Sequence, residues 1–446
     1  MADPVSSIAY AVEAALRALD GDLGLLVVTM AIVLAIVCLI AINYDQLIRR
    51  FPEGGGAVAA TGTAFGEGWA FLPLGALVVD FVLTIAISVA AAAAAVVAYV
   101  PSLAPFKIVI AVLLCCFVAG LTWFGHIGRS VFAAMTVAFV SVALPILVVG
   151  FAAPHSVGTA PAHGAGTSTP WTVLLAFPVA MALATGIEAP ASAVAQLAQL
   201  DDGGRRRFGR VTLILTVAIT GGLTLLLAVL AVRLRTGVPA SDSTMIADVA
   251  RRSVGEGSLF ALFQLTSSLL LLAAASSSFQ AGPGLLKALA RRRGRDGTGQ
   301  GILHPALGAT NRHHTPYWSV LVYLVVSVSV VIAAAAREQS LVLFYAVSVF
   351  VSFLAGLVAM ARYSFRERDR RHLVVNVVGA IVVAFTLAVN LARGYPILSL
   401  AASIAIGAAF AHLWIRQGRP RGIAQAERAM EIGPDAEVLG GPPDGV

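Results

Sequence analysis

Three carboxylate side chains lie in long apolar stretches of the sequence, where a charged group is costly. Asp80 lies within one apolar run, Glu188 lies midway through another, and Asp3 opens the first. A carboxylate at the centre of a bilayer costs at least about 2.5 kcal/mol, so it is retained where it faces a protein interior, a cation or a proton. One such acid is explained by a hydrogen bond between helices, but three acids favour ion or proton chemistry.

Hydroxyl groups share helix faces with two of these acids. Asp80, Thr84 and Ser88 are spaced i, i+4 and i+8, which places them on one side of a helix. A second stripe with similar spacing consists of Asp3, Ser7 and Tyr10. A single Ser or Thr in an apolar helix ordinarily bonds its own backbone. The coincidence of two stripes with two acids is therefore the signal, and it predicts a polar site between helices.

The sequence around Glu188 predicts an interrupted helix. The run Thr185-Gly186-Ile187-Glu188-Ala189-Pro190 surrounds the acid with a weak helix former and a helix breaker. Broken helices in corresponding positions of two halves are typical of the substrate site of a secondary transporter. Pro4 beside Asp3 marks the first span as the partner of this sixth span in an inverted repeat of five plus five helices. The alternative is a packing kink at Pro190.

Composition identifies the elements that must hold these residues. Of the 446 residues, 59% are hydrophobic and only 12% are charged, and the mean hydropathy is +0.89. The apolar runs are too long for the strands of a membrane barrel, so the chain is an all-α integral membrane protein. The histidines and the three cysteines lack the spacing of metal or catalytic sites. We therefore expect no enzyme, no cofactor and no metal beyond a transported cation.

Hydropathy predicts about twelve transmembrane helices with a cytoplasmic C-terminus. Most of the 30 Lys and Arg residues fall in alternate loops, which assigns those loops to the cytoplasm of a multi-pass protein in the cell membrane. The net charge of +7 thus reflects topology, and no nucleic-acid partner is implied. Residues 417–446 are predicted to be a disordered cytoplasmic tail. The predicted spans are 3–19, 23–43, 72–100, 105–124, 131–153, 171–199, 208–234, 257–290, 317–336, 341–362, 372–392 and 396–416.

Several stretches resemble the KimA-type potassium importers, which form part of the KUP branch of the amino acid–polyamine–organocation (APC) superfamily. The resemblance covers the first ten spans. It is carried by residues 3–11, the Phe51-Pro52-Glu53-Gly54-Gly55-Gly56-Ala57 segment, Asp80 to Ser88, Thr185 to Ala189, Ala274 to Pro283 and Leu343 to Phe353.

This resemblance implies a LeuT-type fold in a single transporter domain, residues 1–416. The two inverted repeats would be residues 1–153 and 171–362, followed by extra helices at 372–416. The family has a half-helix ahead of the residue that matches Asp3, so the first helix is expected to be truncated. The family's importers also carry a cytosolic regulatory domain, which we do not transfer to this chain. The resemblance further implies a homodimer in the lipid bilayer.

The resemblance also implies proton-coupled K⁺ transport and assigns its residues. The ion-binding positions would be Tyr10, Asp80, Thr84, Ser88, Thr185 and Tyr345, and the proton-coupling candidates would be Asp3, Asp80 and Glu188. Hydroxyl and carbonyl oxygens suit a dehydrated K⁺. The alternative is a proton-coupled amino acid permease on the same fold, because a fold does not determine its substrate. A non-transporting relative is a third reading.

Overall fold

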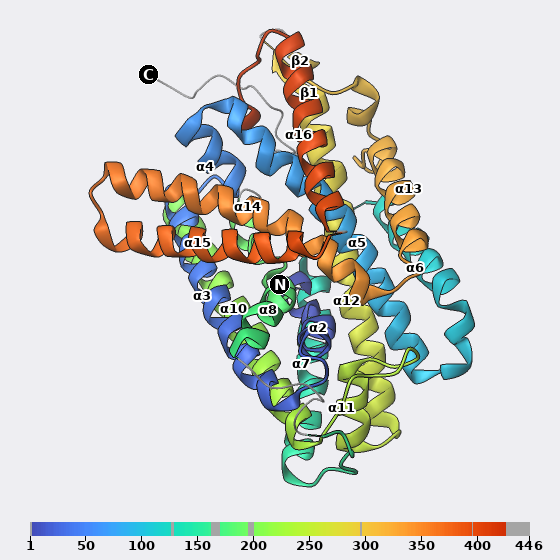
Figure 1. The fold of residues 1–446 in the computed structure, drawn as a ribbon. Helices are drawn as coiled ribbons and strands as arrows, with labels where there is room; N and C mark the ends of the chain where they lie inside the picture. Colours follow the sequence, from blue (N-terminus) through green and yellow to red (C-terminus); the bar gives the residue numbers. More distant parts are fainter. Residues whose placement is uncertain are drawn as a thin grey trace.

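The computed structural model describes residues 2–125, 129–161, 170–194, 200–294, 297–394 and 396–424. Nearly all of this part of the chain is helical (Figure 1). The first predicted span consists of two short helices, α1 (Ala2–Ser6) and α2 (Ile8–Ala18). The longer helices are α3 (Leu23–Arg50), α5 (Phe71–Tyr99), α6 (Lys107–Trp123), α7 (Arg129–Ala152), α10 (Asp202–Arg233), α12 (Ser258–Ala290), α13 (Tyr317–Ala333), α14 (Glu338–Arg366), α15 (Arg370–Ala392) and α16 (Ile397–Arg416).

These helices confirm the all-α membrane class. Within the described ranges, 10 helical segments are long and apolar enough to cross a membrane, including Trp171–Ser192 around the predicted break. The shorter apolar helix α13 and the pair α1 and α2 account for the other two predicted spans. Long apolar runs predict such helices well, because only a segment that bonds its own backbone is stable in hydrocarbon.

The connections contain short elements that hydropathy does not predict. Two helices lie between spans, α4 (Gly56–Phe65) and α11 (Met245–Val254). A hairpin of β1 (Arg291–Gly294) and β2 (Gly297–Gln300) follows α12, with Arg291 opposite Gln300. Each element is too short to span a bilayer, so a window of membrane length does not detect it.

Side-chain caps fix where several helices begin. Asp22 accepts a hydrogen bond from the Gly24 amide at 2.8 Å at the start of α3. Asp201 does the same for Gly204 at 2.9 Å at the start of α10. Such caps satisfy amides that have no partner inside the helix. They separate apolar segments that follow one another after very short connections.

Helix α5, which carries Asp80, lies at the centre of the bundle and packs against α12, α14 and α16 (Figure 1). Its run of alanines at 90–95 is buried almost completely, and small side chains let neighbouring helices approach closely. Gly75 marks the closest approach to α16, since an added Cβ would lie 2.2 Å from the Ser403 carbonyl oxygen. The central position of α5 puts its polar face inside the protein.

The structured chain extends past the predicted start of the C-terminal tail. Gln417 donates a hydrogen bond to the Ile302 carbonyl at 3.1 Å, and the Gly422 amide donates one to Glu67 at 2.8 Å. Residues 417–424 are thus held against the membrane domain, because their backbone finds partners in the loop before α5 and in the segment after β2. Residues 425–446, the rest of the predicted tail, lie outside the described residues.

Candidate functional site

The sixth predicted span is interrupted beside Glu188. It consists of α8 (Pro170–Ala180), a 3-10 turn η3 (Met181–Ala184) and α9 (Ala189–Ala193). Thr185 leaves the helical region with ψ 132°, and Gly186 has φ +74°. A positive φ is accessible to Gly at little cost. The predicted break is therefore confirmed, and Gly186 is the residue that allows the turn.

The break lies directly against the first helix. A Cβ atom added to Gly186 would lie 2.9 Å from Asp3 Oδ2 and 2.8 Å from Pro4 Cδ. The Ser7 hydroxyl, between α1 and α2, donates to the Pro4 carbonyl at 2.6 Å and lies 3.4 Å from the Leu183 carbonyl. Spans one and six therefore meet at their irregular segments, which is the pairing that an inverted repeat requires.

The three acids lie near one another; Asp80 is buried, whereas Asp3 and Glu188 are partly buried. Asp80 interacts electrostatically with both Glu188 and Asp3, and Glu188 interacts with Asp3. One carboxylate oxygen of each, Asp3 Oδ1, Asp80 Oδ1 and Glu188 Oε2, is inaccessible to solvent and has no hydrogen-bond partner. None of the three forms an ion pair with a Lys, Arg or His side chain of the described ranges. When ionised, the acids of this cluster therefore have no basic side chain of the described ranges to balance their negative charge.

Two tyrosines face the same cluster from different helices. The Tyr10 hydroxyl of α2 is within hydrogen-bonding range of Thr185 and interacts electrostatically with Asp3 and Asp80. Tyr345 of α14 lies beside Asp80 and is fully buried, although its hydroxyl has no hydrogen bond of normal geometry. Thr185 itself donates to the Ala182 carbonyl. Six predicted site residues thus share one region: Asp3, Tyr10, Asp80, Thr185, Glu188 and Tyr345.

Thr84 and Ser88 continue the polar stripe along α5. Both are buried, and they lie about 6 and 12 Å along the helix axis from Asp80 at 1.5 Å per residue. No three His, Cys, Asp or Glu side chains in the described segments are close enough to hold a metal ion as a set. A cation here would be bound chiefly by hydroxyl and carbonyl oxygens.

Tyr323 of α13 is a polar neighbour that the sequence analysis missed. It interacts electrostatically with Asp80, and its buried hydroxyl has no partner among the described residues. Gly282 makes room for its ring, because an added Cβ would lie 2.5 Å from Tyr323 Cζ. A lone Tyr in an apolar helix has no spacing that distinguishes it from a core residue. The only sequence signal was Gly282 before Pro283 on the opposite helix.

One end of the first helix is held by a connection from the second half of the chain. The buried Glu13 accepts hydrogen bonds from Arg17 at 2.8 Å and from the Met245 amide of α11 at 3.0 Å. Nearby, Lys107 and Glu338 form an ion pair at 2.9 Å. These contacts join α2, α11, α6 and α14 on one side of the acid cluster.

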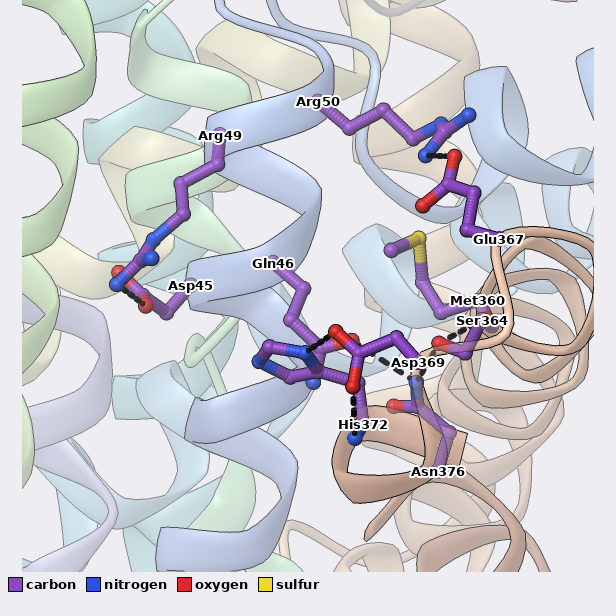
Figure 2. A network of polar contacts seen from close by, with 10 residues as sticks. All are labelled: Asp45, Gln46, Arg49, Arg50, Met360, Ser364, Glu367, Asp369, His372 and Asn376. Atoms are coloured by element: carbon purple, nitrogen blue, oxygen red, sulfur yellow. Dashed lines mark hydrogen bonds and ion pairs between the residues drawn. The ribbon is translucent and has the colours of Figure 1, made fainter. Parts of the chain in front are cut away.

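A separate buried network of amide side chains joins the C-terminal parts of α3 and α14 to α15 (Figure 2). Asn376 accepts from Asn43 and donates to Gln46, both at 2.9 Å, and also lies 3.3 Å from the Ser364 hydroxyl. At its margin, Arg50 pairs with Glu367 at 2.6 Å. This network contains no acid of the candidate site, so it serves helix packing.

Comparison with known proteins supports the class of the site. Residues 3–406 match the family described as Amino acid permease. The potassium transporter KimA of Bacillus subtilis (strain 168) is 25% identical over 411 residues, covering 87% of this chain and 64% of that relative. The chain thus spans less than two thirds of that relative's length. Both similarities point to a transporter and not to an enzyme.

Proposed function

Because this chain belongs to the amino acid permease family and is therefore a secondary transporter, we propose that it carries K⁺ together with H⁺ across the membrane. The observation that carries the proposal is the cluster of Asp3, Asp80 and Glu188, in which each acid has one buried, unpartnered carboxylate oxygen and no ion pair with a Lys, Arg or His side chain of the described ranges. Buried carboxylates are stable only when protons or cations compensate them. K⁺ and H⁺ are cargoes that can compensate these carboxylates, H⁺ by protonating one and K⁺ by binding beside one.

The proposed K⁺ ligands are predominantly neutral oxygens. Tyr10, Thr185 and Tyr345 lie beside the acids, and Thr84 and Ser88 extend the polar face along α5. K⁺ is bound by several oxygens of modest field strength, such as hydroxyls and freed carbonyls. At the break, the carbonyls of Ala184 and Gly186 each accept one backbone N–H, and each keeps a second lone pair for a cation.

In the proposed cycle, one of Asp3, Asp80 or Glu188 exchanges a proton. The loaded carrier then differs in charge from the empty carrier, so an inside-negative potential favours uptake by about 2.3 kcal/mol per charge per 100 mV. The relative KimA is a potassium transporter, which agrees with this cargo. The KUP-branch assignment, a plasma-membrane location, a cytoplasmic C-terminus and a homodimer belong to the same proposal.

The second candidate is proton-coupled transport of an amino acid. The family description and the unwound segment beside Asp3 favour it, because free helix ends bind the charged groups of amino acids. The cluster of three acids argues against it. The carboxylate of a zwitterion would be repelled by them, and its single ammonium would compensate only one charge.

Transport into liposomes separates the two candidates. The purified chain is reconstituted, and uptake of radioactive Rb⁺, as a K⁺ surrogate, is compared with uptake of a panel of amino acids under an inward pH gradient. We expect Rb⁺ uptake that excess K⁺ inhibits and that Asp80→Asn and Glu188→Gln abolish or uncouple from pH. The exposed control Asp20→Asn should retain it. Uptake of an amino acid without Rb⁺ uptake would refute the K⁺ proposal.

A further inference from the structure

A long apolar groove lies beside the candidate site, between α5, α12, α13, α14 and α16. Its volume is about 670 Å³, within the range of small-molecule sites. Val82 and Phe344 form part of its wall. At its rim, Val326 of α13 is 42% exposed and Leu398 of α16 is 63% exposed. Because these are membrane helices, the groove opens toward the hydrocarbon of the bilayer and not toward water.

Arg337 and Ser399 are two of the polar residues that line this groove. Arg337 lines it at the connection between α13 and α14, and within the described chain Arg337 has no ion-pair partner. Its neighbour Glu338 turns instead to Lys107 at 2.9 Å. Ser399, in the first turn of α16, also lines the groove, and its hydroxyl is buried without a hydrogen-bond partner. A cation and an unsatisfied donor thus line an otherwise largely apolar groove.

The length of the groove matches one leaflet of a bilayer. Its lining residues on α13 and its C-terminal cap run from Val322 to Ala334, which corresponds to about 18 Å at 1.5 Å per residue. Half of the hydrocarbon core is about 15 Å thick. A transmembrane helix from a second copy would need about twice this length, whereas one acyl chain fits it.

We propose that this groove binds an anionic phospholipid. The phosphate would lie on Arg337, and one acyl chain would fill the apolar length of the groove toward Val322. Charge-assisted bonds between Arg and phosphate are among the strong hydrogen bonds of proteins. The groove is distinct from the acid cluster, although Tyr323, a neighbour of Asp80, forms part of its wall.

Native mass spectrometry of the purified full-length chain tests the proposal. Retention of phosphatidylglycerol is measured for the wild type, Arg337→Gln and Val326→Trp, with Arg235→Gln as an exposed arginine control outside the groove. We expect about tenfold weaker retention in Arg337→Gln through loss of the charge-assisted bonds. Val326→Trp should exclude the lipid by filling the groove. The control should retain it, and zwitterionic phosphatidylcholine should bind less than phosphatidylglycerol.

Equal retention in all variants would overturn the lipid site. The same spectra also test the main alternative occupant of the groove, a neighbouring copy of the chain. If Val326→Trp converts an oligomer to a monomer while lipid retention is unchanged, the groove is an interface between copies and the proposal is wrong. Arg337→Gln is a conservative change at an exposed position. If Val326→Trp fails to fold, the comparison of lipid retention between Arg337→Gln and the wild type therefore still tests the proposal.

Discussion

Gly186 of the broken sixth span and Asp3 of the first helix are in direct contact. An added Cβ at Gly186 would lie 2.9 Å from Asp3 Oδ2, and Gly186 has φ +74°. The unwound segment therefore packs directly against Asp3. This contact is the point at which the two predicted halves of the transporter meet.

Gly186→Ala should abolish transport. The left-handed conformation costs a non-Gly residue about 1–2 kcal/mol, and the new methyl group also collides with Asp3 and Pro4. The matched control is Gly120→Ala in α6, where an added Cβ meets nothing within 4 Å. That change should keep transport and raise stability by about 0.5–1 kcal/mol. Rb⁺ uptake and thermal unfolding measure both effects, and wild-type uptake by Gly186→Ala would contradict the geometry.

Glu13→Ala should release α11 from the first helix. The Glu13 carboxylate is a buried acceptor for the Met245 amide, and removal of such an acceptor leaves the donor unsatisfied. We expect hydrogen exchange at Met245 to accelerate about tenfold or more. Asp20→Asn, an exposed change near the same helix end, should leave that exchange unaltered. Unchanged protection of Met245 in Glu13→Ala would show that other contacts hold α11.

Asn376→Leu should destabilise the protein by about 2 kcal/mol or more. It leaves the buried side chains of Asn43 and Gln46 without their 2.9 Å partner. Addition of Asn43→Leu should recover part of the loss, because a pair of apolar side chains leaves fewer unsatisfied groups. The exposed neighbour change Val377→Ala should stay within about 0.5 kcal/mol. Strictly additive losses in the double-mutant cycle would refute the coupling.

Asp369 should make a small, pH-dependent contribution to the folding stability of the protein. At the start of α15 this exposed carboxylate accepts hydrogen bonds from the His372 side chain and amide, which lower its pKa below the usual value. A lowered folded-state pKa stabilises the protein above the unfolded pKa of about 3.9, and the effect is lost as pH falls through the folded value. Asp369→Asn should therefore lower the melting temperature at pH 7, and this difference should shrink as pH falls through the folded-state pKa, which lies below the usual value. A larger difference at pH 3 than at pH 7 would reverse the sign and contradict this assignment.

The membrane helices and the break were predictable from sequence because both have local signals. Apolar length identifies the spans, and Gly186 with Pro190 identifies the interruption. Asp80 and Glu188 were detectable because an acid in an apolar run is costly. All of these signals lie within one helix length of the residue concerned.

The contacts between distant segments were not predictable. Glu13 pairs with an amide 232 positions away, and Asn43 pairs with Asn376 333 positions away. A single polar residue does not indicate its partner, since only the three-dimensional packing of the helices selects it. The same reason explains why Tyr323 was not recognised as a neighbour of Asp80. The apolar groove, which five helices form together, has no local signature either.

Proton movement driven by a K⁺ gradient tests the central claim most directly. Liposomes containing the purified chain and a trapped pH indicator are given an inward K⁺ gradient at clamped membrane potential. We predict acidification of the lumen by the wild type, and none by Glu188→Gln, because K⁺ and H⁺ would enter together. Acidification driven by an amino acid gradient but not by a K⁺ gradient would contradict K⁺ as the transported cation that binds at the acid cluster.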